Sequence, residues 1–154
     1  MINTDNFAGI IESFYEKIRA VGADKANIKL SADKWSLKEM IGHLIDSASN
    51  NHQRFVRLQS GDLLNFPAYE GEKWVKAERY DSLDWAVVTL LWHNYNRLLL
   101  HIVRNTGDEH LKNVWVKDED TAITLEELIT NYYEHIKVHV KLFSDREQEI
   151  NGRA

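Results

Sequence analysis

The sequence predicts an all-α protein, and more specifically a four-helix bundle with long connections between the second and third helices and between the third and fourth. Two observations support this fold class. The 154 residues include one proline and many strong helix formers. Four segments repeat apolar residues at steps of three and four, which is the period of an amphipathic helix. A chain of this length is expected to form a single domain over residues 1–154.

The composition also limits the classes of function. Cysteine is absent, which excludes a disulfide framework, a cysteine-based zinc site and a cysteine nucleophile. The net charge of −5, without a basic stripe, argues against nucleic acid as a partner. No apolar run reaches the roughly 18 residues of a membrane span, and the N-terminal residues do not resemble a signal peptide. We therefore expect a soluble, cytoplasmic protein.

The first helix is expected over residues 6–21, where the apolar residues form one stripe. Thr4 or Asp5 is a suitable N-terminal cap, and Gly22 is a suitable stop. The polar segment 23–35 then connects to the second helix. That helix begins with a capping box, Ser36 with Glu39, and is expected to end near residue 59.

The second helix carries an apolar face and, along one edge of that face, a line of polar residues that we call the polar seam. The helical period places eight residues on the apolar face: Leu37, Met40, Ile41, Leu44, Ala48, Asn51, Phe55 and Leu58. The polar seam consists of His43, Ser47, Asn50 and Arg54. His43 can therefore reach the interior of the bundle.

The connection over residues 61–81 contains four aromatic residues, which are too many for a solvated linker. We expect it to be packed, with a short helix around Trp74, and to act either as a lid or simply as a cover of the core. The third helix, 83–105, is expected to be capped by Ser82. It is apolar on almost every side, so it should be buried by the connection or by a second subunit in a homodimer.

Residues 108–122 form the second long connection, in which 113–117 alternate as in a β-strand and suggest an irregular hairpin. A second capping box, Thr124 with Glu127, begins the fourth helix. This helix is expected to end near Ser144, and the polar tail from Asp145 is expected to fray.

Three histidines form a candidate metal site. His135 and His139 stand four residues apart on the fourth helix, so their side chains lie on the same face. His43 supplies the third imidazole from the second helix. The other four histidines are not expected in the site. His93 is expected at the surface or at an interface, and His101 also faces outward. His52 lies at the opposite edge of the second helix from His43, and His110 lies in a connection.

Three neutral imidazoles suit Zn²⁺, Ni²⁺, Fe²⁺ or Cu²⁺ and leave at least one coordination position open. A metal lowers the pKa of a coordinated water or thiol, so hydrolysis and thiol transfer both fit. No separate general base is evident, and further catalytic residues remain unidentified. Asp46 is expected either at the surface or as a hydrogen-bonding partner of the site.

The segments KWSLKEMIGHLIDSASNNHQRF and TLEELITNYYEHIKVHV resemble those of the DinB-like superfamily, in its branch of metal-dependent hydrolases and bacillithiol transferases. The resemblance covers residues 35–139. It implies a four-helix bundle, often dimeric, that binds one divalent metal, commonly zinc or nickel. The positions that match the family's ligands are His43, His135 and His139.

The resemblance implies a small-molecule substrate and a low-molecular-weight thiol as cosubstrate, because the chain has no cysteine of its own. A thiol that carries carboxylates would need cations near the opening. Arg54 is about 16 Å along the helix from His43, too far for a contact at the metal, and is expected either in a structural ion pair or in contact with a remote group of the substrate. Thiol transfer to an electrophile is the leading hypothesis. The alternatives are a metal-dependent hydrolase and a non-catalytic bundle that binds metal or another ligand.

Overall fold

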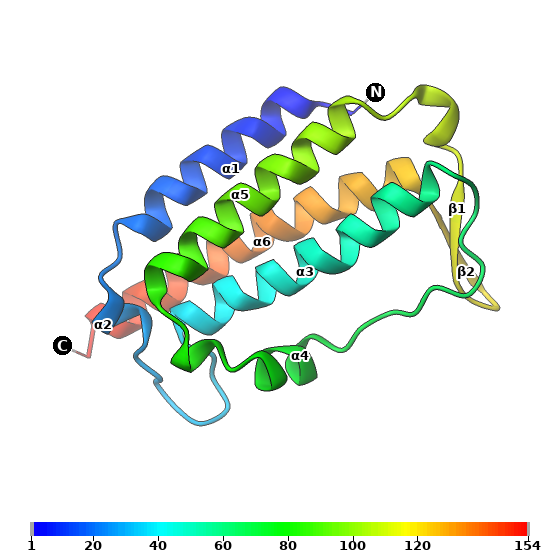
Figure 1. Ribbon diagram of the computed structural model, residues 1–154. Coiled ribbons are helices and arrows are strands. Elements are labelled where there is room, and N and C mark those ends of the chain that lie inside the picture. The colour runs from blue at the N-terminus through cyan, green and yellow to red at the C-terminus, as the bar shows by residue number, and fades with distance from the viewer. Residues whose placement is uncertain (1, 154) are drawn as a thin grey trace.

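Four long helices dominate the computed structural model, which describes residues 2–153 (Figure 1). They are α1 (Thr4–Arg19), α3 (Leu37–Leu58), α5 (Trp85–Arg104) and α6 (Leu125–Asn151). The smaller elements are α2 (Ala23–Ala26), α4 (Gly71–Glu78), the strands β1 (Val114–Asp118) and β2 (Thr121–Thr124), and 3-10 turns at 80–82 and 108–110. The predicted four-helix bundle is confirmed.

The long helices form a ring in which α1 and α3 each pack against both α5 and α6. α3 and α5 are neighbours that run in the same direction along the bundle, opposite to α1 and α6 (Figure 1). The chain must therefore return along the whole bundle between the end of α3 and the start of α5. This return carries α4 back beside the first turns of α3, where the candidate site lies.

The returning connection is packed, as expected, and the predicted short helix around Trp74 is α4. At one end, Leu63 bonds through its backbone to Val114 and Val116 of β1. At the other end, Lys38 of α3 donates to the Leu83 carbonyl at 2.8 Å. Because hydrogen bonds fix both ends, the connection has a defined course over the side of the bundle.

Both predicted capping boxes are present. The Ser36 hydroxyl accepts from the backbone N–H of Glu39 at 3.1 Å, and the Glu39 carboxylate accepts from the backbone N–H of Ser36 at 2.8 Å. Thr124 and Glu127 make the same pair of bonds at the start of α6. The boxes fix the residue at which each helix begins, and so the rotational position of every side chain that follows.

Two other caps differ from expectation. α1 is capped one residue earlier, by Asn3, whose side chain accepts from the backbone N–H of Asn6 at 3.0 Å. α5 is capped by Asp84 rather than Ser82. The Ser82 hydroxyl instead donates to the carbonyl of Arg79 at 2.9 Å, within the 3-10 turn that precedes the helix.

The C-terminal tail is helical rather than frayed. α6 continues to Asn151, and Ile150 is buried with 5% of its surface exposed. Arg146 donates a hydrogen bond to the carbonyl of Trp35, and Glu149 pairs with Lys34 at 3.2 Å. These contacts tie the last turns of α6 to the segment before α3, which explains why a polar sequence stays ordered there.

His93 is buried rather than at the surface. Its Nε2 lies 2.9 Å from a carboxylate oxygen of Glu12, and its ring stacks on Tyr15 with 3.8 Å between the centroids. α1 covers this side of α5, which explains why α5 is apolar on several faces. Leu91 of the same helix is 42% exposed, so α5 also keeps an apolar side that α1 does not cover.

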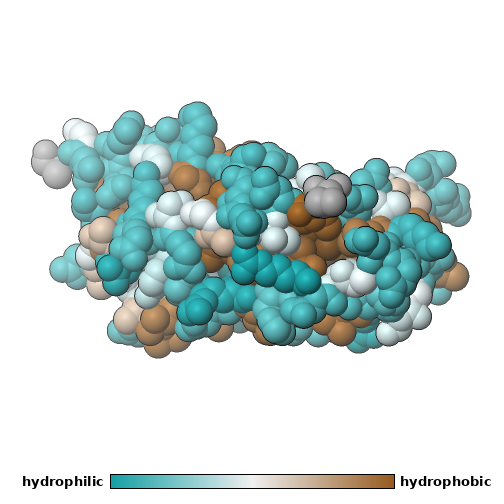
Figure 2. Space-filling model, turned by 90° about the horizontal axis from the view of Figure 1, so that it is seen from above, coloured by the Kyte–Doolittle hydropathy of each residue, from teal (hydrophilic) through white to brown (hydrophobic). Residues whose placement is uncertain are grey.

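The face over α1 is mostly hydrophilic, with separate hydrophobic areas (Figure 2). Among residues 2–153, no helix is both long enough and apolar enough to cross a membrane.

Candidate metal centre

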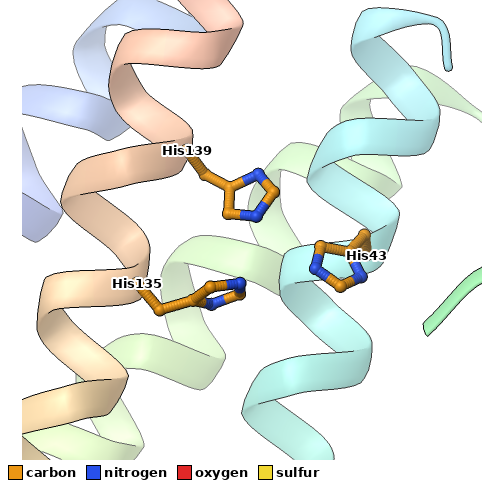
Figure 3. A group of neighbouring side chains, drawn as sticks. All are labelled: His43, His135 and His139. Atoms are coloured by element: carbon orange, nitrogen blue, oxygen red, sulfur yellow. The ribbon is translucent and has the colours of Figure 1, made fainter. Parts of the chain in front are cut away.

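The structure brings the three predicted histidines together. His43 extends from α3, and His135 and His139 from α6, and the three rings point toward one another (Figure 3). One ring nitrogen from each lies within 4.8 Å of the other two. The ring centroids are 5.5 Å apart for His43 and His135, 4.9 Å for His43 and His139, and 4.5 Å for His135 and His139.

Local sequence explains this convergence. His135 and His139 are related by i and i+4, so they lie one turn apart on the side of α6 that faces α3. The capping box at Ser36 sets the phase of α3 and turns His43 toward α6 in its second turn. Each ring is about half-buried, and α3 and α6 pack directly against each other.

Burial keeps these imidazoles neutral. It lowers the pKa of His43 to about 4, with a smaller effect from the nearby His135. Burial also lowers the pKa of His139 to about 4, assisted by the other two imidazoles. The pKa of His135 is lowered by burial alone. Neutral imidazole is the form that binds a metal ion.

Two of the ring nitrogens lack a partner. The Nδ1 atoms of His43 and His139 are buried and make no hydrogen bond within the described residues. An unpaired buried polar atom is costly, and coordination to a metal is one way to satisfy it. The donor set of three imidazoles and the two unpaired nitrogens together fit a divalent transition metal.

Two residues that the sequence interpretation did not assign to the site enclose His43. A Cβ atom added to Gly71 would lie 2.9 Å from His43 Cε1 and 3.0 Å from Nδ1, so the backbone of α4 lies directly on the imidazole. The indole of Trp35 lies on the same ring, 5.0 Å between centroids. The signals in the sequence are a glycine inside the aromatic connection and a tryptophan directly before the Ser36 capping box.

A cavity of about 410 Å³ opens beside the histidines, with His139 in its wall. Trp35, Met40 and Leu142 contribute its apolar surface, and six charged residues line the remainder. The first turn of α4 also contributes, through Glu72. The connection thus covers His43 while the side toward His139 stays accessible to a small molecule.

Two polar residues of α3 differ from expectation. Asp46, one turn after His43, is 2% exposed, and its Oδ1 accepts from the Tyr80 hydroxyl at 2.6 Å. Arg54 makes no ion pair within the described part of the chain. It lies over the Trp115 ring, 4.1 Å from the centroid, and donates to the Pro67 carbonyl at 3.3 Å. Arg54 therefore holds the long connection and the hairpin against α3.

The remaining histidines lie outside the site. His101 is exposed on α5, as expected. His52 bonds to the hydroxyl of Tyr95 at 3.1 Å, and His110 lies in the 3-10 turn at 108–110. None of them belongs to a group of potential metal ligands among the described residues.

Comparison by sequence matches the chain to no protein-family model and to no curated protein. Comparison by structure does find similar proteins. YfiT from Bacillus subtilis, described as "a probable metal-dependent hydrolase with an unusual four-helix bundle topology", has a TM-score of 0.81 and 16% identity. The match covers 98% of this chain and 91% of YfiT.

A second similar structure is the mycothiol-dependent maleylpyruvate isomerase, with a TM-score of 0.71 and 9% identity. The match covers 90% of this chain and 60% of the isomerase, so this chain corresponds to only part of that protein. At these identities the likeness concerns the fold. Both proteins are members of the DinB-like superfamily. The chain therefore shares the four-helix bundle fold of these structures, in agreement with the fold class that its sequence predicted.

Proposed function

We propose that this protein is a divalent-metal-dependent enzyme that transfers a small thiol to an electrophile. His43, His135 and His139 hold the metal, with zinc or nickel as the proposed ion. The observation that carries the proposal is the convergence of three neutral imidazoles beside a cavity large enough for a small molecule. The substrates are small molecules rather than nucleic acids.

The chemistry follows from the donor set. When bound, a divalent metal lowers the pKa of a coordinating thiol and so supplies a thiolate at neutral pH. In the reaction, the sulfur forms a bond to the electrophilic carbon. The leaving group departs with its bonding electron pair, and the proton of the thiol goes to solvent. Trp35 and Gly71 exclude water from the His43 side, and the cavity walls orient the two reactants.

A metal-dependent hydrolase is the second candidate, favoured by the likeness to YfiT. Thiol transfer stands first because no carboxylate joins the three histidines within residues 2–153. A general base assists attack by water more than attack by a thiolate that is already formed. Asp46, the nearest acid along α3, is engaged with Tyr80.

Metal content tests the site. Protein purified without chelator is expected to contain about one zinc or nickel per chain by elemental analysis, and His139→Ala is expected to lose most of it, because two imidazoles hold the ion poorly. His101→Ala changes the same residue type at an exposed position of α5 and should keep its metal. A fully loaded His139→Ala protein would overturn the ligand assignment.

Activity tests the reaction. The metal-loaded protein is assayed with a panel of low-molecular-weight thiols and a chromogenic aryl halide, and in parallel with ester and amide substrates. Thiol-dependent release of halide supports transfer. Cleavage of esters or amides without any thiol reaction favours the hydrolase. A protein without metal that folds normally in chelator would instead support the non-catalytic bundle.

We also propose that the protein forms a homodimer through α5. Val87, Leu90, Leu91 and Leu98 of this helix are each between 42% and 49% exposed. Burying them against a second copy would remove apolar area from water. Light scattering is expected to give twice the chain mass of 18.0 kDa, and a monomeric mass at assay concentration would contradict the proposal.

A further inference from the structure

Tyr80 joins the returning connection to the helix that carries His43. Its side chain is 5% exposed, and its hydroxyl donates to Oδ1 of Asp46, which is 2% exposed, at 2.6 Å. Breaking this hydrogen bond inside the protein would leave two buried polar atoms without a partner, which is costly. The bond therefore holds the end of α4 and the 3-10 turn at 80–82 against α3.

A glycine in α3 makes room for the Tyr80 ring. A Cβ atom added to Gly42 would lie closer than 3.0 Å to three ring atoms, Cγ, Cδ2 and Cε2. The ring therefore rests directly on the backbone of α3, at the residue immediately before His43. Glycine inside a helix is unfavourable compared with alanine, and the contact with Tyr80 explains why α3 has a glycine among its buried residues.

The backbone just before Tyr80 is strained. Arg79 ends α4 with φ 53° and ψ 47°, the left-handed conformation, and among the described residues it is the only one other than glycine with a positive φ. Such a conformation persists where surrounding contacts impose it. Tyr80, seated on Gly42, supplies one such contact. Lys38 supplies another, because its ammonium group donates to the carbonyl of Asp81 at 3.1 Å. The left-handed turn thus directs the chain from the end of α4 onto the surface of α3.

α4 transmits the position of Tyr80 to the candidate metal centre. The helix runs from Gly71 to Glu78, about 12 Å at 1.5 Å per residue, and Val75 in its middle is 4% exposed. At the end opposite to Tyr80, the backbone of Gly71 lies on the imidazole of His43. Because a short, closely packed helix transmits a displacement along its length, a shift of Tyr80 would also move Gly71 relative to that ring.

We propose that Tyr80 is a positioning residue of the candidate metal centre. Its contacts with Gly42 and Asp46 hold α4 in place, and α4 in turn holds the His43 imidazole toward the other two histidines. The connection is then a fixed wall of the site rather than a lid that opens, and small molecules enter through the cavity beside His139. The role toward a metal rests on the proposed function, whereas the positioning of the imidazole needs no metal.

The positioning is tested first on metal-free protein by NMR. The measurements are the amide hydrogen exchange of residues 72–82 and the nuclear Overhauser effect between Hα of Gly71 and Hε1 of His43. Gly42→Ala places a methyl group where the Tyr80 ring lies, so the ring must leave its seat on α3. We expect amide exchange in residues 72–82 to become at least about tenfold faster, and the Overhauser effect to disappear.

Gly9→Ala is the matched control, because it makes the same replacement in a helix where nothing lies within 4 Å of the added Cβ. It should change neither measurement. The proposal is overturned if exchange in residues 72–82 is unchanged in Gly42→Ala. It is also overturned if exchange accelerates equally in all the helices, as a general loss of stability would produce.

A second pair of variants decides the question if Gly42→Ala does not fold. Tyr80→Phe keeps the ring and removes only its hydrogen bond to the buried carboxylate, and should accelerate exchange in residues 72–82 by at least about threefold. Tyr95→Phe removes a hydroxyl that bonds to His52 at 3.1 Å, outside the site, and should leave this segment unchanged. Equal exchange in the two variants would contradict the proposal.

The link to the metal is tested with cobalt-substituted protein, whose visible absorption bands respond to the geometry of the ligands. Gly42→Ala is expected to bind cobalt about tenfold more weakly and to show altered bands when saturated, because His43 is displaced. Gly9→Ala should match the wild type in both. Wild-type bands and affinity in Gly42→Ala would overturn the positioning role. If the wild type binds no cobalt, the proposed metal function fails, while the exchange and the Overhauser effect still decide whether Tyr80 positions His43.

Discussion

Gly71 determines how closely the backbone of α4 approaches the imidazole of His43. The replacement Gly71→Ala would bring a methyl group within 2.9 Å of the ring, so the ring or the helix must shift. We expect this variant to bind metal roughly tenfold more weakly, because misplacing one of three ligands costs on the order of 1–2 kcal/mol. Competition with a chromophoric chelator measures the affinity.

Gly9 provides the matched control, since nothing lies within 4 Å of a Cβ added there. Gly9→Ala in α1 should leave metal affinity unchanged and raise the free energy of unfolding by roughly 0.5–1 kcal/mol, the usual advantage of alanine within a helix. Equal metal affinity in both variants would show that α4 does not constrain His43.

Asp46 gives a prediction about pH. Burial raises its pKa to about 6, opposed by the Tyr80 hydrogen bond and reinforced by the charge of Glu78. The folded state therefore binds this proton more tightly than the unfolded state, where the pKa is near 3.8. Ionisation of Asp46 therefore lowers the free energy of unfolding progressively as the pH rises from about 4 through 6. Above that range the loss of stability reaches its full value.

Asp46→Asn removes this titration but keeps an oxygen that can accept from Tyr80. The compared quantity is the unfolding free energy of the variant minus that of the wild type. This difference is expected to be about 1–3 kcal/mol larger at pH 8 than at pH 4. Urea unfolding at the two pH values measures the difference. A stability difference that does not change with pH would contradict the raised pKa.

At the scale of the element, the last turns of α6 are expected to contribute to stability despite their polar sequence. Ile150 is 5% exposed, and Ile150→Ala is expected to cost about 2–4 kcal/mol, the typical cost of a large-to-small change in a core. Val138→Ala on the same helix, where the side chain is 57% exposed, should cost less than about 0.5 kcal/mol. Equal effects would indicate that the tail frays.

The two ends of α6 show which features of the fold could be predicted from the sequence and which could not. Its start was predicted because a capping box involves residues only three positions apart. Its end was not, because the partners that hold it, Lys34 and the carbonyl of Trp35, lie more than 100 positions away along the chain. Local patterns identify the helices, whereas tertiary contacts decide how far they extend.

The same distinction applies to the candidate site. The convergence of His43, His135 and His139 was predicted because helical phase is a local property. The closeness of Gly71 to His43 and the burial of Asp46 depend on where a long connection returns, and no local pattern encodes that course. Arg54 was assigned an ion pair for the same reason, since its actual partners belong to the connection and the hairpin.

At the scale of the whole molecule, the three histidines come from two antiparallel helices that are far apart in the sequence, α3 and α6. A metal held by both helices binds the folded state and not the unfolded chain, so its binding free energy adds to stability. With free zinc at 100 times its dissociation constant the gain is about 2.7 kcal/mol. For a domain of this size, that corresponds to a rise in Tm of roughly 5–10 °C.

Thermal unfolding of the wild type with zinc and with chelator is expected to show this rise, and the rise should grow with the logarithm of the zinc concentration. His139→Ala should melt at the same temperature under both conditions, whereas His101→Ala, altered at an exposed position, should behave as the wild type. An equal shift in His139→Ala would place the stabilising ion elsewhere. The absence of any shift in the wild type would mean that the three imidazoles, although they converge, do not couple α3 to α6 through a metal.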